Sequence, residues 1–233
     1  MKENQNVLIL IPCCKRKKEH PSCDYSTPLT GIEQLRNQLL EYIKKAFELS
    51  KKPENQKGIL NLNASLTKAI DLYNGRFYKV AGENLRKIMT GQYPSINVLI
   101  VSAFYGLAKL DEGLKLYDLR MDDKLNNMKI YQFWQQNQLW KILQNYIVQN
   151  SISYIWSLLS FPYHCVFNDL WSQSEKLKIQ VIHVKINIQS NAIIYYRAKW
   201  LNWILDTNPN YLTLNPFPPN KIPNIPYQIT YDC

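Results

Sequence analysis

Two short runs of branched apolar residues, each ending abruptly at a loop, restrict the fold more than any other feature of the sequence. The runs cover residues 7–12 and 96–102. Continuous β-branched and aliphatic runs of this kind are typical of strands that are buried on both faces, as in a parallel sheet. Segments with apolar residues at three- and four-residue spacing lie between and after them. This alternation predicts an α/β fold with a largely parallel central sheet flanked by helices.

Further periodic segments set the expected domain organisation. We expect helices at residues 32–47, 78–91, 130–148 and 192–205, and two more strands at residues 152–159 and 179–186. Six prolines then fall within residues 209–226, and proline disfavours both a helix interior and a central strand. The sequence therefore predicts one α/β domain over residues 1–206. Residues 207–233 are predicted to form a proline-rich C-terminal extension, either an extended strap or a mobile end.

The chain is strongly basic, with 28 Lys and Arg against 18 Asp and Glu and a formal net charge of +10. A compact basic body attracts polyanions, so this charge favours a nucleic-acid partner, while the plainer interpretation is solubility alone. No apolar run approaches the roughly 18 residues of a membrane helix, and the N-terminus does not resemble a secretory signal. We expect no membrane partner and a cytoplasmic location.

Several common kinds of site lack their signatures in this sequence. Five cysteines, two of them adjacent, fit neither a disulfide framework nor a familiar zinc module. The sequence contains no Walker loop, dinucleotide fingerprint, HExxH helix or GxSxG elbow. We therefore expect no metal and no cofactor.

The loops that follow the two apolar runs are the first candidate sites, because ligands of open parallel sheets bind outside the carboxyl ends of the strands. The first loop contains two cysteines and a basic run, namely Cys13, Cys14, Lys15, Arg16, Lys17 and Lys18. The second loop combines small and aromatic residues, namely Ser102, Phe104, Tyr105 and Gly106. Glycine and small residues at such places let a ligand approach the backbone closely.

Two more segments bring acids, phenols and basic residues together. One contains Asp71, Tyr73, Gly75 and Arg76, and the other contains Tyr117, Asp118 and Arg120. Each residue also has a purely structural interpretation. An Asp before a glycine often caps a turn, a surface Asp and Arg often form a weak ion pair, and a Tyr is often a core aromatic. Likewise, the cysteines are more often small buried hydrophobes than nucleophiles, although a thiolate beside the basic run leaves a redox-sensing role open, and the basic run can be a solvated surface.

Together and in this order, the four segments resemble the YaaA-like group, which comprises the peroxide-stress protein family and its smaller phage and bacterial relatives. Later segments around Tyr163 and Lys199 also resemble that group, so the likeness covers residues 7–205. The acids Asp71 and Asp118 place the chain with the smaller relatives. The Cys-Lys loop is also similar to accessory domains of archaeal tRNA-guanine transglycosylases, which implies a uracil-DNA-glycosylase-like fold.

Both likenesses imply work on nucleic acid or on a nucleobase, and our leading hypothesis is a DNA glycosylase, an N-glycosidic hydrolase that flips and excises a modified base, with a role in antiviral defence. Its partner is double-stranded DNA. Asp118 and Asp71 are the expected catalytic acids, because a carboxylate stabilises the positive charge that develops on the sugar. The expected base or substrate contacts are Cys13, Cys14, Tyr73, Gly75, Ser102, Phe104, Tyr105, Gly106, Tyr117, Arg120 and Tyr163. The expected phosphate contacts are Lys15, Arg16, Lys17, Lys18, Arg76 and Lys199.

Two other functions stay open beside this hypothesis. The first is a non-catalytic DNA-binding stress protein of the YaaA kind, since family members are linked to DNA binding under oxidative stress. The second is an enzyme of nucleoside or nucleotide glycosyl transfer, for which the positive charge would hold substrate phosphates. The sequence leaves the recognised base and the oligomeric state undetermined.

Overall fold

A mixed six-stranded sheet forms the centre of the protein in the computed structural model, which describes residues 5–50, 61, 63–188 and 192–232. The strands follow the order β10-β9-β8-β1-β3-β4. Their bounds are β1 Asn6–Pro12, β3 Ile96–Ser102, β4 Gly106–Lys109, β8 Ile152–Ser157, β9 Gln180–Ile186 and β10 Ile229–Asp232. Strands β1, β3, β8 and β9 are parallel, and the antiparallel strands β4 and β10 form the two edges. The predicted α/β class with a mostly parallel sheet flanked by helices is confirmed.

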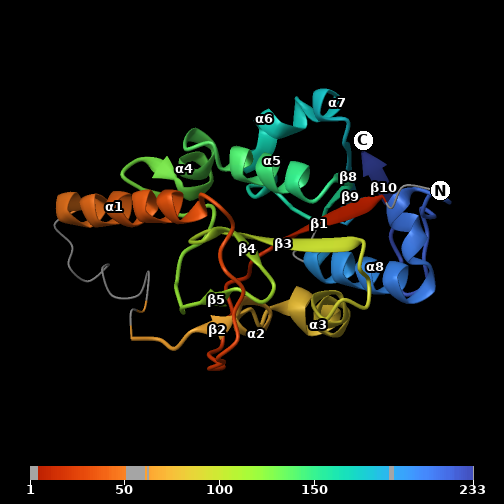
Figure 1. The fold of residues 1–233 in the computed structure, drawn as a ribbon, viewed down its shortest axis with the longest axis horizontal. Coiled ribbons are helices and arrows are strands. Elements are labelled where there is room, and N and C mark those ends of the chain that lie inside the picture. Colours follow the sequence, from red (N-terminus) through yellow and green to blue (C-terminus); the bar gives the residue numbers. More distant parts are fainter. Residues whose placement is uncertain (1–4, 51–60, 62, 189–191, 233) are drawn as a thin grey trace.

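Helices cover the two faces of this sheet (Figure 1). On one side lie α4 Ile130–Gln136, α5 Leu139–Gln149, α6 Asn168–Trp171 and α7 Ser174–Leu177. On the other side lie α3 Arg76–Met89 and α8 Ile193–Thr207, which pack against each other. Helix α1, Ile32–Ser50, lies beyond the β4 edge and contacts β4 and α5. None of the described helices is both long and apolar enough to cross a membrane.

The central strand β1 is buried along its length. Its successive side chains point to opposite faces of the sheet, and helices cover both faces. Its residues Val7 to Ile11 are at most 1% exposed. The largest buried side chains around it include Trp134, Trp156 and Trp200. Their indole N–H groups donate to Ala103 O, Leu212 O and the Tyr231 hydroxyl. The continuous apolar runs in the sequence therefore identify the buried strands correctly, as expected for a covered parallel sheet.

The structure breaks the single helix that we expected over residues 130–148. Helix α4 ends at Gln136 and α5 begins at Leu139, and the intervening Gln138 has φ +57°. A left-handed residue cannot continue a right-handed helix, so the chain turns there. Both halves keep their apolar faces on the core, which is why one continuous periodic pattern hides the break.

The proline-rich segment joins the body more closely than an extended strap or a mobile end would. It begins with a short 3-10 helix, η3 Pro209–Thr213, which has proline at its first position. Its apolar residues Leu212, Ile222 and Ile225 are buried. After the last proline, β10 pairs antiparallel with β9. The boundary between residues 206 and 207 stays a prediction, while the last strand of the predicted extension belongs to the main sheet.

Short elements complete the chain around the carboxyl ends of β1 and β3. Helix α2, Ala69–Leu72, precedes α3, and the 3-10 helix η2, His164–Phe167, precedes α6. Two small antiparallel pairs lie outside the main sheet, β2 Thr67–Lys68 with β5 Gly113–Leu114, and β6 Lys124–Leu125 with β7 Met128–Lys129. The polar sequence of residues 51–57 predicts a loop, and this segment lies outside the described residues.

Candidate functional site

The order of the strands locates the place where a ligand is expected. From β1 the chain first builds β3 on one side and only later builds β8 on the other side of β1. The carboxyl ends of β1 and β8 thus flank a topological switch point, where ligands of open α/β sheets bind. The side chains of Cys13, after β1, and Tyr163, after β8, meet there, with 3.4 Å between sulfur and hydroxyl. The loop of residues 13–18, which the sequence predicts as a candidate site, lies at this edge.

Three buried hydroxyl groups form a closed triangle beside this point. The Tyr73 hydroxyl lies 3.1 Å from Ser102 Oγ and 3.0 Å from the Tyr117 hydroxyl, and the last two are 2.9 Å apart. The backbone N–H of Tyr105 also donates to Ser102 Oγ, at 3.0 Å. Burial raises the pKa of both Tyr73 and Tyr117 well above their ordinary value. These phenols therefore stay protonated and act as hydrogen-bonding groups, not as bases.

The fold keeps the thiol of Cys14 away from reactive chemistry. Cys14 donates to Arg16 O at 2.9 Å, and burial raises the pKa of this thiol to about 12. Because the thiolate is the nucleophile, a raised pKa makes Cys14 unreactive at neutral pH. Gly75 lies so close that a Cβ there would be 2.7 Å from the Cys14 Cβ. The Cys14 side chain thus fills a space that only glycine leaves open.

Lys17 places a positive charge on one ring of the hydroxyl triangle. Its Nζ lies 3.9 Å from the centre of the Tyr117 ring, in cation–π geometry, and 3.5 Å from Lys15 O. Burial lowers the pKa of Lys17, and the negative charge of Asp118 opposes that shift. No carboxylate of the described residues lies within 4 Å of Lys17 Nζ. A half-buried cation without a direct ion-pair partner is suited to meet an external anion.

Backbone hydrogen bonds hold the basic loop against the start of α3. Lys18 N donates to Leu72 O and Asn74 N donates to Arg16 O, both at 2.9 Å. The side chains of Lys15, Arg16 and Lys18 are exposed, as is that of Arg76 at the first position of α3. The fold therefore collects these predicted phosphate contacts at one edge of the sheet. Lys199 lies apart on α8, where its Nζ is 3.4 Å from Asn224 O.

Two of the three predicted acid and arginine residues, Asp71 and Arg120, form ion pairs with other side chains. Asp71 forms an ion pair of 2.5 Å with Arg86 of α3. Asp118 is exposed and makes no ion pair within 4 Å among the described residues. Arg120 binds Asp123 at 3.1 Å, so it is engaged in a surface pair. Asp71 and Arg120 thus have structural partners, but these partners are Arg86 and Asp123 and not the turn and the Asp118 pair that we weighed beside the catalytic roles.

The second loop is part of the core. Phe104 is 2% exposed, and the Tyr105 hydroxyl both donates to Lys115 O at 3.0 Å and accepts from Lys115 N at 2.8 Å. Gly106 has φ +68°, a conformation that favours glycine, and Trp134 packs against it. The faces of these rings pack against other rings, Phe104 against Tyr117 for example. The rings of Phe104 and Tyr105 both pack against Tyr117, which belongs to the hydroxyl triangle.

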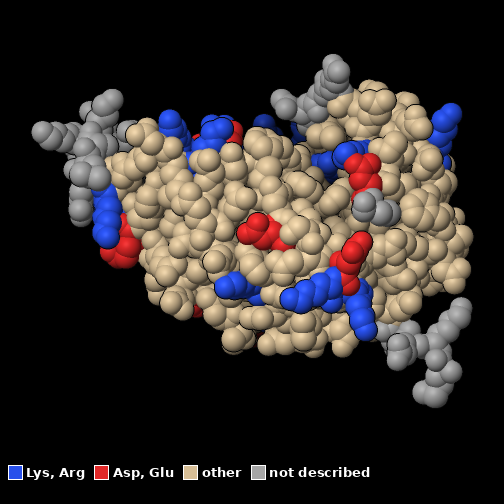
Figure 2. Space-filling view, turned by 90° about the horizontal axis from the view of Figure 1, so that it is seen from above, with Lys and Arg blue, Asp and Glu red and all other residues tan. Residues whose placement is uncertain are grey.

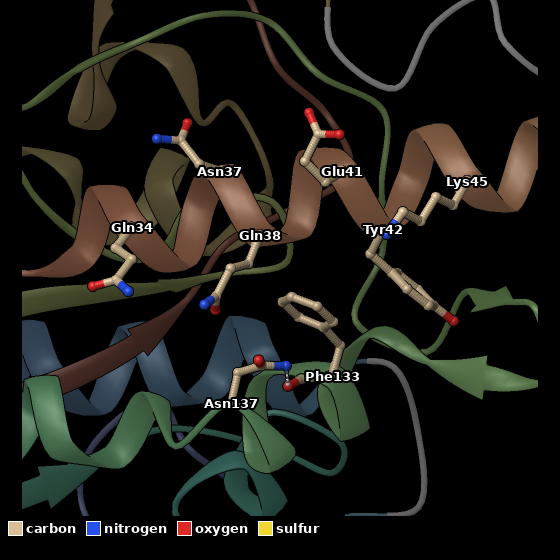
Figure 3. A pocket seen from close by; sticks show the side chains of 8 residues that line it. All are labelled: Gln34, Asn37, Gln38, Glu41, Tyr42, Lys45, Phe133 and Asn137. Carbon is tan, nitrogen blue, oxygen red and sulfur yellow. Dashed lines mark hydrogen bonds between the residues drawn. The ribbon is translucent and has the colours of Figure 1, made fainter.

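Sequence reasoning missed one residue of this site and one hollow elsewhere. Tyr78 of α3 donates to Pro12 O at 2.9 Å and ties α3 to the end of β1. The helical spacing of apolar residues in this segment does not indicate that Tyr78 makes a polar contact. A hollow of about 800 Å³ lies between α1 and α4, where Gln38 and Phe133 point into the space (Figure 3). Four of its eight lining residues are amides, and its carboxylate, Glu41, is exposed and paired with Lys44. Among the described residues, no three His, Cys, Asp or Glu side chains gather as metal ligands would.

Comparison with known proteins agrees with the order of motifs along the chain. A family model described as "Peroxide stress protein YaaA" matches residues 7–200. The chain belongs to this family. It is similar to UPF0246 proteins of Rickettsia rickettsii (strain Iowa) and Rickettsia felis, at 30% identity over 95 and 88 residues. These matches cover 41% and 38% of this chain, and 36% and 33% of the relatives. The chain thus spans about a third of the length of the curated relatives that it matches.

Membership of the YaaA peroxide stress family corrects the leading functional hypothesis. The expectation of a DNA glycosylase is wrong, because both the family model and the curated relatives lead to peroxide stress and UPF0246 proteins. Base flipping, base excision and antiviral defence, which depended on that hypothesis, are withdrawn with it. The alternative of a stress protein of the YaaA kind agrees with the family.

Proposed function

We propose that this protein is a non-catalytic, DNA-binding stress protein of the YaaA kind. It binds double-stranded DNA through the carboxyl edge of its sheet. The observation that carries this proposal is the basic edge, which we define as Lys15, Arg16, Lys17, Lys18, Arg76 and Lys79. Within the described part of the chain, none of these six side chains has a carboxylate within 4 Å.

The basic edge differs from the rest of helix α3, where cations are neutralised. Arg86 pairs with Asp71 and Lys87 pairs with Glu83, at 2.5 and 3.1 Å. Unpaired cations attract a polyanion more strongly than paired ones, because no internal carboxylate competes with the phosphates. The net charge of +10 adds a long-range attraction in the same sense.

The opposite layer presents a different surface. Figure 2 views the molecule from the side of α4 to α7, and most of that face carries neither acidic nor basic side chains. Charges there are scattered, and blue and red side chains lie side by side. A duplex is therefore better matched by the basic edge than by this face. As part of this proposal, we expect the fold, but not the activity, to resemble that of uracil-DNA glycosylases. We also propose a cytoplasmic location, which is compatible with a DNA partner.

The test measures binding of a fluorescent duplex by anisotropy across a series of salt concentrations. The variant combines Lys15→Gln, Arg16→Gln and Lys18→Gln. Each phosphate contact contributes about 0.9 to the slope of log K against log salt, so the slope should fall by about 2 to 3. The matched control combines Lys141→Gln, Lys176→Gln and Lys178→Gln on the opposite layer, removing the same charge from exposed positions. Equal losses in both variants, or no duplex binding by the wild type at low salt, would overturn the proposal.

A further inference from the structure

A groove of about 470 Å³ lies between the first turns of α3 and α8, next to the basic edge. Its lining comes from both helices and from the residue before α8, namely Arg76, Lys79, Val80, Ala192, Tyr195 and Tyr196. Helix α8 follows β9 and α3 precedes β3, so both first turns lie at the carboxyl edge of the sheet. A groove of this volume is within the size range of small-molecule sites.

One wall of the groove carries positive charge without a partner. Arg76 and Lys79 are exposed, and neither forms an ion pair with a described residue. About two to three turns further along the same helix, Arg86 and Lys87 are both paired with carboxylates. The two cations at the groove are thus free to bind an anion, and a guanidinium beside an ammonium suits a phosphate.

The opposite wall is aromatic and fixed in orientation. The rings of Tyr195 and Tyr196 lie 5.2 Å apart in an edge-to-face arrangement, and Tyr227 packs edge-on against Tyr196 at 5.1 Å. Lys199 Nζ lies 4.8 Å from the centre of the Tyr195 ring. Edge-to-face packing holds each ring plane, so the aromatic wall is already ordered before a ligand arrives.

From this juxtaposition we propose that the groove binds an unpaired nucleotide. The base packs on Tyr195 and the phosphate binds Arg76 and Lys79. A flat ring joined to a phosphate is the ligand chemistry that an aromatic wall facing two cations recognises. Its source is either a free nucleoside monophosphate or the single-stranded end of a DNA molecule. Only the second source rests on the proposed function.

Calorimetric titration of the full chain with thymidine monophosphate, adenosine monophosphate, adenosine and inorganic phosphate tests the free source. The monophosphates should bind at least ten-fold more tightly than adenosine or phosphate alone. Tyr195→Ala should weaken their binding about ten-fold, because the stacking face is lost. Tyr195→Phe keeps the ring and should bind like the wild type. Lys79→Gln should also weaken binding about ten-fold, whereas Lys87→Gln, its counterpart further along α3, should leave it unchanged.

Anisotropy with a blunt duplex and with the same duplex carrying a single-stranded overhang tests the DNA source. Preference for the overhang that Tyr195→Ala abolishes, with blunt binding intact, supports the groove as the site of the unpaired end. Monophosphate binding without any duplex binding supports the groove while the proposed DNA function fails. Duplex binding without overhang preference, together with no monophosphate binding, overturns this inference and leaves the DNA function standing. Equal monophosphate binding by wild type and Tyr195→Ala also overturns it.

Discussion

Arg36 and Lys17 are both cations that the fold draws away from solvent, but their surroundings differ in one decisive respect. Arg36 of α1 is 6% exposed, and it lies 2.6 Å from Glu112 and 2.7 Å from Glu33. Its remaining donors reach Tyr105 O at 3.0 Å and Leu107 O at 2.9 Å. Every branch of this guanidinium is occupied, so its charge serves the connection between α1 and β4.

Lys17 has the opposite surroundings. It faces an aromatic ring and a backbone carbonyl, and its pKa is lowered by burial. The fold bears an energetic cost there that the negative charge of Asp118 offsets only in part, since no carboxylate of the described residues pairs directly with Lys17. The difference separates a structural cation from one that is available to a partner. It also tells which substitutions should affect stability and which should affect binding.

The largest effect should come from breaking the satisfied pair. Glu112→Gln keeps the shape of the side chain but leaves Arg36 buried beside a neutral amide. We expect the free energy of unfolding to fall by about 3 kcal/mol, the lower end for a broken buried ion pair, because Glu33 still contacts the guanidinium. Urea denaturation measures this loss.

The control for this prediction is an exposed pair on the same helix. Glu41 lies 2.7 Å from Lys44, and both side chains are more than half exposed. Glu41→Gln should leave the denaturation midpoint unchanged, because exposed pairs contribute little. Similar losses in the two variants would show that Arg36 is not the structural cation that its contacts indicate.

The sequence predicts the strands better than the site, for a physical reason. Residues 7–12 and 96–102 are buried on both faces, and this burial dictates continuous apolar residues that are visible in one dimension. The break at Gln138 depends on one left-handed residue inside a periodic pattern, so the pattern conceals it. Strand β10 is short and follows a proline-rich segment, and its pairing with β9 and the packing of Tyr231 on Trp156 and Trp200 are long-range contacts that its own residues do not indicate.

The candidate site shows the same limit. The basic loop could be predicted, because four consecutive cations after a buried strand are a local feature. The roles of Asp71 and Arg120 could not, because each depends on a partner that only the fold brings near, Arg86 in one case and Asp123 in the other. The groove beside Tyr195 joins residues more than a hundred positions apart in the chain, so no local motif contains it.

An intermediate effect should follow from adding one methyl group where the basic loop meets α3. In Gly75→Ala the new Cβ would lie 2.7 Å from Cys14 Cβ and 2.8 Å from its Sγ, so the loop must shift. Overpacking of this kind costs about 1 to 3 kcal/mol. Thermal and urea unfolding measure the loss, and duplex binding should weaken with it because the basic edge is displaced.

Gly82→Ala, inside α3, is the matched control for that substitution. Its new Cβ would meet only the end of the Arg86 side chain, at 3.2 Å, and that end can move. Since alanine is favoured over glycine within a helix by roughly 0.5 to 1 kcal/mol, this variant should be as stable as the wild type or slightly more so. A loss in Gly82→Ala as large as that in Gly75→Ala would remove the special role of the Cys14 contact.

The smallest effect on stability should come from Lys17→Met, which removes the unpaired cation. Because burial lowers the Lys17 pKa in the folded state, protonation opposes folding at neutral pH. Between the lowered pKa and the ordinary lysine value of about 10.4, the unfolded chain still holds a proton that the folded chain has released. The stability of the wild type therefore rises with pH in this range. The stability of Lys17→Met should therefore equal or exceed that of the wild type at pH 7, and this advantage should shrink as the pH approaches 10.

The ionisable neighbours of Lys17, namely Cys13, Cys14 and Asp118, are present in both proteins, so their contributions largely cancel in this difference. Urea unfolding at pH 7, 8, 9 and 10 measures it. A clear loss of stability at pH 7 would mean that the contact with the Tyr117 ring outweighs the cost of burial, and Lys17 would then be a structural cation like Arg36.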